Sequence, residues 1–403
     1  MKASRPWLVV GLLWFVACFN WMARGMITTM HGSIVQAIPM NEAQFGLLTS
    51  AFAWVYGGLS PFAGFLSDRF SRSRVIGLSL VAWSTATFLT GYATNLPQLV
   101  AMRALMAVGE VCYLPAASAL ITDYHHGSTR SLASGLHMTG IAAGAALAGL
   151  GGWLAESHAW AFPFRIVGLT GMVYGGGLFL FLRDAPRAVL PAAARPRINF
   201  THAVASMLSR GSFLLVVAYS ILSGIVGWVV FGWMPTFLQE RFHLSQGVAG
   251  MSATTYMNFA YLPGLLLGGY WADRWRRRQA RATILVPVIG LLVAAPGIFL
   301  AAHTVLLGLA LLGLVLYGMA GGIFDANLMP ILCDISDPRY RATGYGILNC
   351  VGTLSGGLAI YATGALRDLH FDLGHILAVS SVALLICPLL LYLIKPTAGS
   401  SSG

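Results

Sequence analysis

The residues Gly64-Phe65-Leu66-Ser67-Asp68-Arg69-Phe70-Ser71-Arg72-Ser73-Arg74 join two apolar segments of the chain. A similar stretch, Gly269-Tyr270-Trp271-Ala272-Asp273-Arg274-Trp275-Arg276-Arg277-Arg278, follows a later apolar segment, and Asp273 lies 205 positions after Asp68. Other matched pairs lie 211 positions apart: Asp123 with Asp334, Arg130 with Arg341, and Gly135 with Gly346. Because several pairs share a nearly constant offset, the chain is predicted to consist of two repeated halves.

The composition of the chain indicates a membrane protein. Of its 403 residues, 57% are hydrophobic and only 9% are charged, whereas a soluble domain carries roughly 25% charged residues. A water-exposed surface cannot be built from this chain, which excludes a soluble enzyme, a nucleic-acid-binding protein and a disordered scaffold. The five cysteines all lie in apolar stretches without the spacing of metal ligands, so neither a disulfide framework nor a metal site is expected.

Apolar segments long enough to span a bilayer, about 20 residues each, divide the chain into two sets of six. The longest stretch that is not apolar separates the two sets and predicts an N-terminal bundle over 1–182, a cytoplasmic linker over 183–211, a C-terminal bundle over 212–395 and a flexible tail over 396–403. The twelve predicted spans are 7–30, 44–67, 74–95, 97–122, 131–155, 161–182, 212–238, 246–271, 282–303, 305–333, 341–366 and 371–394.

The basic residues predict the orientation of these spans. The formal net charge is +11, and 19 of the 24 Lys and Arg residues fall on one side of the predicted topology. Lys and Arg accumulate in cytoplasmic loops. Both termini and the linker are therefore expected in the cytoplasm of a cell (inner) membrane protein, and the positive charge requires no nucleic-acid partner.

Two facing six-helix repeats are typical of alternating-access transporters, which bind their substrate near the middle of the membrane. The Gly-x-x-x-Asp-Arg-x-x-Arg loop and the division into six and six spans resemble the major facilitator superfamily. Within it, the segments Ser50-Ala51-Phe52-Ala53-Trp54-Val55-Tyr56 and Arg103 to Glu110, followed by Pro115, resemble the organic-anion (anion:cation) symporter branch. Spinster-like lipid transporters share a related pattern.

This resemblance implies an all-α fold of twelve transmembrane helices in two pseudo-symmetric halves. The segment Asn20-Trp21-Met22-Ala23-Arg24 is similar to the Asn-Tyr-x-Asp-Arg pattern of the symporter branch. Ala23 replaces an aspartate that is implicated in proton coupling in that family, so one protonation site implied by the resemblance is missing here.

Two arginines within the spans are the first candidates for substrate binding, because charge inside the bilayer is costly and usually functional. Arg24 lies roughly 25 Å along the first span from its cytoplasmic start, and Arg103 lies roughly 9 Å along the fourth span from its outer start. At this similar depth, two guanidinium groups facing one aqueous cavity suit a carboxylate or phosphate. In the alternative interpretation, Arg103 pairs with Glu110 and Arg24 caps backbone carbonyls.

Two acidic residues within the spans are candidates for proton coupling. Glu110 lies about two helical turns after Arg103, roughly 10 Å along the axis, which is long for a direct pair. It is predicted to exchange a proton as the cavity opens and closes, or else to form a permanent structural salt bridge. Asp325 either replaces the acid lost at Ala23, binds a cationic group of the substrate, or bonds to a neighbouring helix near Gly321 and Gly322.

Other polar groups within the spans are candidates for lining the substrate site, with packing between helices as the alternative for each. His137 is the one histidine placed deeply in a span, and its imidazole is a group that titrates near neutrality. The remaining candidates are Asn20, Tyr56, Tyr113, Tyr256 and Tyr317.

The repeated loops predict a gate, and one span predicts close helix packing. At cytoplasmic helix ends, Asp68 and Asp273 are expected to form charge-assisted pairs with basic residues of the same motif and to latch that side while the outer side is open. The predicted gating residues are Asp68, Arg69, Arg72, Asp273 and Arg274. Gly140, Gly144 and Gly149 are predicted sites of close packing.

The sequence as a whole predicts a monomeric secondary transporter that imports a small organic anion (a carboxylate or sugar acid) together with a proton. Export of an amphipathic lipid or drug is the first alternative, and a membrane enzyme or a non-transporting receptor is an alternative of another class. The sequence contains neither a nucleophile constellation nor a Walker-type phosphate loop. We therefore expect no catalysis, no cofactor, no metal and no ATP; the lipid bilayer, the anion and the proton are the expected partners.

Overall fold

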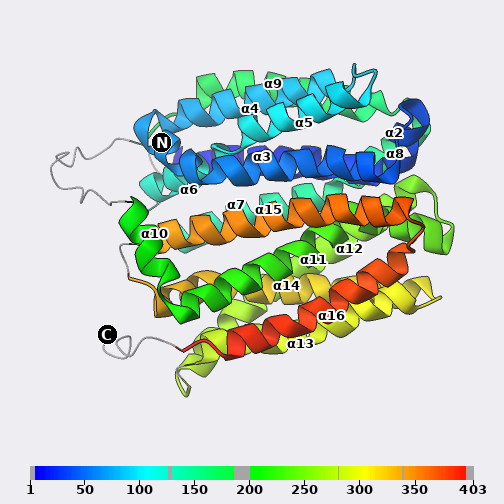
Figure 1. Cartoon of the computed structure of the whole chain (residues 1–403). Coiled ribbons are helices and arrows are strands. Elements are labelled where there is room, and N and C mark those ends of the chain that lie inside the picture. Colours follow the sequence, from blue (N-terminus) through cyan, green and yellow to red (C-terminus); the bar gives the residue numbers. More distant parts are fainter. Residues whose placement is uncertain (1–4, 126–128, 186–199, 280, 338–339, 396–403) are drawn as a thin grey trace. The chain divides into compact units, whose positions relative to one another are not determined.

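The computed structural model describes residues 5–125, 129–185, 200–279, 281–337 and 340–395, and every described element is a helix. The predicted tail (396–403) and the part of the linker at 186–199 lie outside these residues. Each predicted span is helical over most of its length (Figure 1). Nine helical segments of the described chain are apolar and long enough to cross a membrane. The remaining predicted spans correspond to α3 (Glu42–Arg69), α4 (Arg72–Thr90) and α12 (Gln246–Arg276).

The chain folds into two compact units. Unit 1 comprises Met1–Leu190 together with Met234–Thr255, and unit 2 comprises Pro191–Trp233 together with Tyr256–Gly403. The helices wholly within the first segment of unit 1 are, beside α3 and α4, α1 (Arg5–Gly25), the 3-10 helix η1 (Met26–Thr29), α2 (His31–Ala37), α5 (Leu96–Glu110), α6 (Tyr113–Tyr124), α7 (Arg130–Leu147), α8 (Leu150–Ser157) and α9 (Ala161–Phe181).

The later helices are α10 (Phe200–Leu208), α11 (Gly211–Phe242), α13 (Ala282–His303), α14 (Leu307–Ile335), α15 (Arg341–Asp368) and α16 (Leu373–Tyr392). The end of α11 and the start of α12 belong to unit 1, although both helices were predicted within the C-terminal bundle. Hydrogen bonds explain this assignment: Gln246 Nε2 donates to Ser33 Oγ at 2.8 Å, and Thr254 Oγ1 donates to the Ala146 carbonyl at 2.9 Å.

Small residues determine how closely the helices of unit 1 pack. α1 packs against α7, and a Cβ atom added to Gly140 would lie 2.6 Å from the Trp14 carbonyl oxygen. A Cβ atom at Gly144 would overlap the Cys18 backbone, and one at Gly149 would lie 2.6 Å from the Met251 Cα atom. The predicted packing role of Gly140, Gly144 and Gly149 is confirmed.

Unit 2 is built around α14. α13 packs against both α14 and α16, and α15 also contacts α14. A Cβ atom at Gly322 or Gly318 would collide with the Tyr261 or Met257 carbonyl oxygen, so α12 passes α14 at backbone contact. The arrangement holds the middle of α14 firmly against α12.

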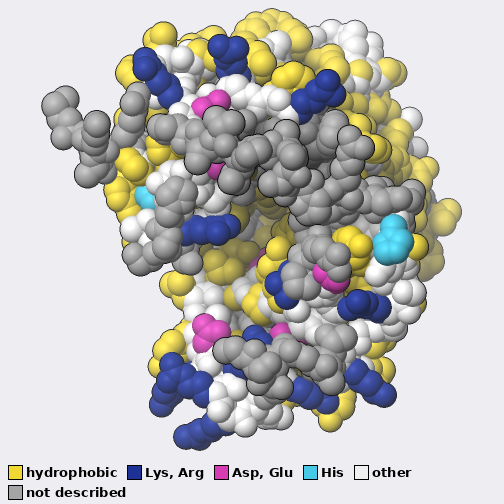
Figure 2. Space-filling view, turned by 90° about the vertical axis from the view of Figure 1, so that its left-hand side faces the viewer, with side chains coloured by type: hydrophobic (Ala, Val, Ile, Leu, Met, Phe, Trp, Pro, Cys, Tyr) yellow, Lys and Arg dark blue, Asp and Glu magenta, His cyan; other side chains and the backbone are white. Residues whose placement is uncertain are grey.

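Lys and Arg side chains stand out on the face shown in Figure 2, which is at the left of Figure 1, where α10 lies. Within each unit, we call the helix ends that carry these side chains the arginine-rich end of that unit. α1 begins there, as does α4 with Arg72 and Arg74. The orientation predicted from the basic residues stays a prediction.

Candidate functional site

Two charged residues of unit 1, Arg24 and Glu110, lie where helices end inside the predicted membrane region. α1 ends at Gly25, one residue after Arg24, and α5 ends at Glu110. The sequence predicted one continuous helix over 97–122, but two turn residues separate α5 from α6. Pro115 provides the physical reason, because its ring cannot donate to the Val111 carbonyl and clashes with it. The break leaves the Glu110 side chain at the end of α5.

Arg24 and Glu110 form a buried ion pair. Arg24 Nη2 donates to Glu110 Oε2 at 2.7 Å, and Arg24 Nε donates to the same oxygen at 3.2 Å. The two residues are only 5% and 1% exposed. Arg24 also approaches Asn20, whose Oδ1 lies 3.5 Å from Nη2. The carboxylate therefore already neutralises the Arg24 guanidinium in this structure.

Aromatic rings surround the Arg24 guanidinium. Its central carbon lies 4.7 Å from the ring centroids of Trp21, Phe52 and Tyr56. The Phe52 and Tyr56 rings stack at 5.6 Å because they are one helical turn apart on α3. Cation–π attraction to these rings stabilises the charge in a region from which water is excluded. Phe52 was not predicted as a site residue, although its position one turn before Tyr56 is the signal that identifies it.

Arg103 is a second buried cation, and no acidic residue of the described chain forms an ion pair with it. It is 3% exposed, its Nη2 donates to the Arg24 carbonyl at 3.3 Å, and its guanidinium lies 5.0 Å from the Phe52 ring centroid. Three buried polar atoms around this cluster have no hydrogen-bond partner in the described structure: Asn20 Nδ2, Arg103 Nε and Glu110 Oε1. With two arginines and one glutamate, this cluster carries one uncompensated positive charge.

The sequence predicted that Arg24 and Arg103 lie at similar depth, and the hydrogen bond between the two residues agrees with this. In the alternative interpretation, Arg103 pairs with Glu110 and Arg24 bonds to backbone carbonyls, and the structure shows the opposite assignment. Glu110 pairs with Arg24, and Arg103 is the arginine that bonds to a backbone carbonyl. Both guanidinium groups are buried in this structure, whereas the sequence predicted that they face an aqueous cavity. The seven-residue spacing of Arg103 and Glu110 already disfavoured their direct contact.

Tyr113 and His137 form a second polar group in unit 1, between α6 and α7. The Tyr113 hydroxyl lies 2.8 Å from His137 Nε2 and donates to the Leu13 carbonyl at 3.0 Å. A carbonyl only accepts, so the single hydroxyl hydrogen goes to Leu13 and His137 Nε2 carries the hydrogen of the other bond. Both side chains are buried with these partners, which ties α1, α6 and α7 together.

Unit 2 contains the other predicted acid, Asp325, in the middle of α14. The Tyr261 hydroxyl on α12 donates to Asp325 Oδ2 at 2.9 Å, and the Asp325 residue is exposed. The predicted residue Tyr317 is half-buried on α14, and Tyr256 is exposed on α12. Tyr261 was not predicted, because no local pattern identifies which residue of another helix meets Asp325.

Each unit carries an ion pair at its own arginine-rich end. Arg72 pairs with Asp123 in unit 1 and donates to the Ala119 carbonyl at 3.1 Å. Arg276 pairs with Asp334 at 3.0 Å in unit 2, and Thr283 also donates to Asp334. The sequence singled out Asp123 and Asp334 as repeat positions but not as partners of the motif arginines.

The remaining predicted gating residues are neighbours in sequence of Arg72 and Arg276, the arginines of these two pairs. The Asp68 side chain lies outside the described part of the structure. Arg69, Asp273 and Arg274 are exposed, and among the described residues no ion pair joins Asp273 to Arg274. The motif therefore contributes its second basic position, Arg72, to a described ion pair.

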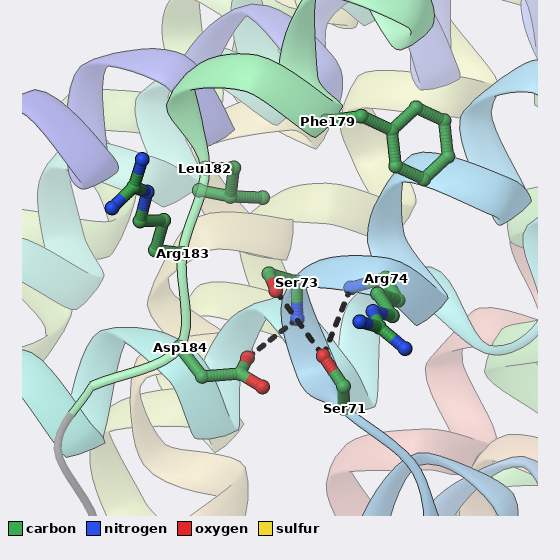
Figure 3. A pocket seen from close by; sticks show the side chains of 7 residues that line it. All are labelled: Ser71, Ser73, Arg74, Phe179, Leu182, Arg183 and Asp184. Carbon is green, nitrogen blue, oxygen red and sulfur yellow. Dashed lines mark hydrogen bonds between the residues drawn. The ribbon is translucent and has the colours of Figure 1, made fainter.

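A pocket of about 310 Å³ lies beside the start of α4. Figure 3 shows Asp184 directed toward the start of this helix, where its Oδ1 accepts from the Ser73 backbone N–H at 2.8 Å. This carboxylate occupies the place that an external anion would take at the helix N-terminus. The pocket is lined by Ser71, Ser73, Arg74, Phe179, Leu182, Arg183 and Asp184.

Comparison with known proteins agrees with the repeated six-helix design. The family model described as Major Facilitator Superfamily matches residues 13–360. The chain belongs to the Major Facilitator Superfamily. It is therefore a membrane transporter rather than an enzyme, as the sequence predicted.

Relatives of this superfamily member include transporters of organic acids and spinster-like proteins. It is 27% identical to an MFS-type efflux pump of Mycolicibacterium smegmatis, over 92% of this chain and 86% of that protein. It is 26% identical to a probable sulfoacetate transporter of Cupriavidus necator, over 95% and 93% of the two chains. A solved bacterial homolog of the human lysosomal transporter spinster, in an inward-facing and occupied conformation, matches with a TM-score of 0.79 at 22% identity, covering 97% of each chain.

Proposed function

We propose that this transporter imports a small organic anion, a carboxylate or sugar acid, together with a proton. The observation that carries the proposal is the uncompensated positive charge of the Arg24–Arg103–Glu110 cluster. A buried charge without a partner is unfavourable. An entering anion would compensate this charge, which gives the empty cluster a preference for negatively charged substrates.

The ion pair suggests how anion binding and proton binding are coupled. Glu110 occupies the donor groups of Arg24 that suit a carboxylate, since Nη2 and Nε both bond to Oε2. A proton on Glu110 would weaken this pair, and a substrate carboxylate would then take over the Arg24 donors in a bidentate arrangement. Arg103 would contribute its partnerless Nε. Coupling in this scheme requires no acid at Ala23.

The remaining residues of unit 1 have positioning roles in this proposal. Asn20 and Tyr56 lie beside the Arg24 guanidinium and would orient it, whereas Tyr113 and His137 would hold the helices that carry the cluster. The Arg72–Asp123 and Arg276–Asp334 pairs would stabilise the arginine-rich end of each unit in one state of the transport cycle.

We also propose that the transporter acts as a monomer in the cell inner membrane, with both termini in the cytoplasm. One chain already supplies both compact units. The basic residues at one end support the orientation through the preference of Lys and Arg for the cytoplasmic side.

Export is the second candidate function. An efflux pump is among the relatives, and the three rings around Arg24 offer an apolar surface to an amphipathic compound. The same cluster would then exchange a proton for the exported compound. Import with a proton accumulates the compound inside proteoliposomes that are more acidic outside. Export by proton exchange accumulates it inside proteoliposomes that are more acidic inside.

The experiment is uptake of radiolabelled carboxylates, with sulfoacetate, gluconate and benzoate as probes, into proteoliposomes that are more acidic outside. Import predicts accumulation of at least one probe above its external concentration, and an uncoupler abolishes it. Arg24→Gln should abolish uptake, whereas Arg165→Gln, which changes an arginine that bonds to the Gly91 carbonyl, should not. Accumulation that ignores the uncoupler would refute proton coupling, and full uptake by Arg24→Gln would refute the anion site.

A further inference from the structure

Asp325 differs from the acid of unit 1 because no cation among the described residues neutralises it. It lies roughly 27 Å along α14 from the first residue of the helix, well inside the apolar region. Its carboxylate has one hydrogen-bond partner in the described structure, the Tyr261 hydroxyl, and no Lys, Arg or His forms an ion pair with it there. A carboxylate at this depth is costly unless a positive charge or a proton compensates it.

Three arginines of unit 2 are engaged at the ends of its helices. Arg276 pairs with Asp334, Arg341 donates to the Cys333 carbonyl at 3.1 Å, and Arg210 donates to the Ile335 carbonyl at 2.9 Å. These acceptors lie at the last turns of α14, some 8 to 10 residues beyond Asp325, which is roughly 12 to 15 Å along the helix. None of these three arginines therefore compensates the charge of Asp325.

Tyrosines of three helices stand near this carboxylate. The Tyr261 hydroxyl on α12 donates to Asp325, Tyr219 on α11 contacts Phe324, the neighbour of Asp325, and Tyr317 lies about two turns before Asp325 on α14. The Tyr219 ring packs on Phe324 with centroids 4.3 Å apart. An organic cation is attracted by aromatic ring faces and by a carboxylate, and quaternary ammonium groups are recognised in this way.

The site is also held in place. Gly318 and Gly322 bring α14 into backbone contact with α12, on which Tyr261 stands. Asn327 Nδ2 donates to the Gly268 carbonyl at 3.3 Å and adds a polar link between the same helices. A rigid frame lowers the cost of ordering the binding groups when a ligand enters.

We propose that unit 2 contains a binding subsite for an organic ammonium group, with Asp325 as its counter-ion and Tyr219, Tyr261 and Tyr317 as its aromatic surround. This inference goes beyond the proposed function, because it adds an organic ammonium compound to the ligands that the transporter binds. A hard metal cation fits less well, since Ca²⁺ and Mg²⁺ require about six oxygen ligands and the described site offers one carboxylate.

The test is direct binding to the purified full-length protein in nanodiscs by isothermal titration calorimetry, at constant ionic strength. The probe is choline, and its neutral isostere 3,3-dimethyl-1-butanol has the same shape without the charge. We expect saturable choline binding at least tenfold tighter than binding of the alcohol. Asp325→Asn should weaken choline binding at least tenfold, while its amide oxygen still accepts from Tyr261.

Asp372→Asn is the matched control, because it removes the same charge at the exposed start of α16, where either side chain caps the Gly374 backbone N–H. It should leave choline binding unchanged. Tyr317→Leu should weaken binding severalfold and Tyr317→Phe should not, because the phenylalanine ring retains the cation–π attraction. Size-exclusion profiles and melting temperatures establish that each variant is folded.

Equal binding of choline and the alcohol, or an unchanged choline affinity in Asp325→Asn, overturns the subsite. If the wild-type protein does not bind choline and Asp325→Asn loses gradient-driven uptake, the subsite is overturned and Asp325 is a proton carrier instead. The binding assay uses neither a gradient nor a carboxylate, so its outcome is independent of uptake. Carboxylate uptake without choline binding refutes the subsite alone, and choline binding without carboxylate uptake refutes the proposed function alone.

Discussion

Replacement of Glu110 by glutamine separates substrate binding from proton coupling. In the wild-type protein Glu110 Oε2 accepts two hydrogen bonds from Arg24, at 2.7 and 3.2 Å, in a site that is almost fully buried. Glutamine has a similar shape but no charge and no exchangeable carboxyl proton. If Glu110 competes with the substrate for Arg24, Glu110→Gln should therefore bind the anion more tightly and transport it without accumulation.

The magnitude follows from the bonds that change. A hydrogen bond to a charged group contributes about 1.5–3 kcal/mol, and the glutamine amide oxygen retains part of that interaction with Arg24. If the substitution removes about 1.4–2.8 kcal/mol from the free energy with which Glu110 competes for Arg24, the anion binds roughly tenfold to hundredfold more tightly. The ionic part of the buried pair also contributes to stability, and breaking such pairs costs about 3–5 kcal/mol when one partner is removed entirely. We therefore expect a lower melting temperature in the empty variant that bound anion restores.

The assay combines three measurements on the same preparation. Calorimetric titration of the transported carboxylate gives the affinity, counterflow in proteoliposomes gives exchange, and acid-driven uptake gives accumulation. Glu110→Gln should show tighter binding and intact exchange, but no accumulation under a proton gradient. The double variant Arg24→Gln with Glu110→Gln should lose the gain in affinity, because the guanidinium that profits from the change is absent.

Unchanged or weaker binding by Glu110→Gln would refute competition between Glu110 and the substrate. Gradient-driven accumulation at the wild-type level would remove Glu110 from proton coupling. A gain in affinity that persists without Arg24 would show that the anion binds elsewhere.

Three further predictions concern packing and the ends of the helices. Gly144→Leu should lower the melting temperature by several degrees and reduce the yield of folded protein, since any Cβ atom there collides with the Cys18 backbone; Gly176→Leu, where no atom lies within 4 Å of the added Cβ, should be tolerated. Tyr113→Phe should cost about 1–2 kcal/mol, measured as a fall in melting temperature, because Leu13 and His137 lose an interhelical partner, while the affinity for the anion stays near wild type. Asp334→Asn should weaken the Arg276 pair and raise protease or thiol-probe accessibility at the arginine-rich end of unit 2; unchanged accessibility would show that the pair does not hold that end together.

The sequence by itself determined the class of protein, the positions of the spans and the short inventory of charges within them. These properties are local, because hydropathy over about 20 residues indicates whether a segment can lie in the bilayer. The constant offset between Asp123 and Asp334 likewise requires only counting along the chain. The same inventory already contained Arg24, Arg103, Glu110 and Asp325, since charge is rare in a span and therefore conspicuous.

Only the tertiary structure decided which of these groups meet. Glu110 bonds to Arg24 on another helix rather than to Arg103 on its own, and Asp325 meets Tyr261. Partners across helices depend on how each helix is rotated about its axis and how closely the backbones approach. Glycines such as Gly322 set that approach through contacts with another helix, and the sequence order does not encode which helix it is. Burial of the arginines and the uncompensated charge of each cluster follow from this packing, because a charge is neutralised by its neighbours in space.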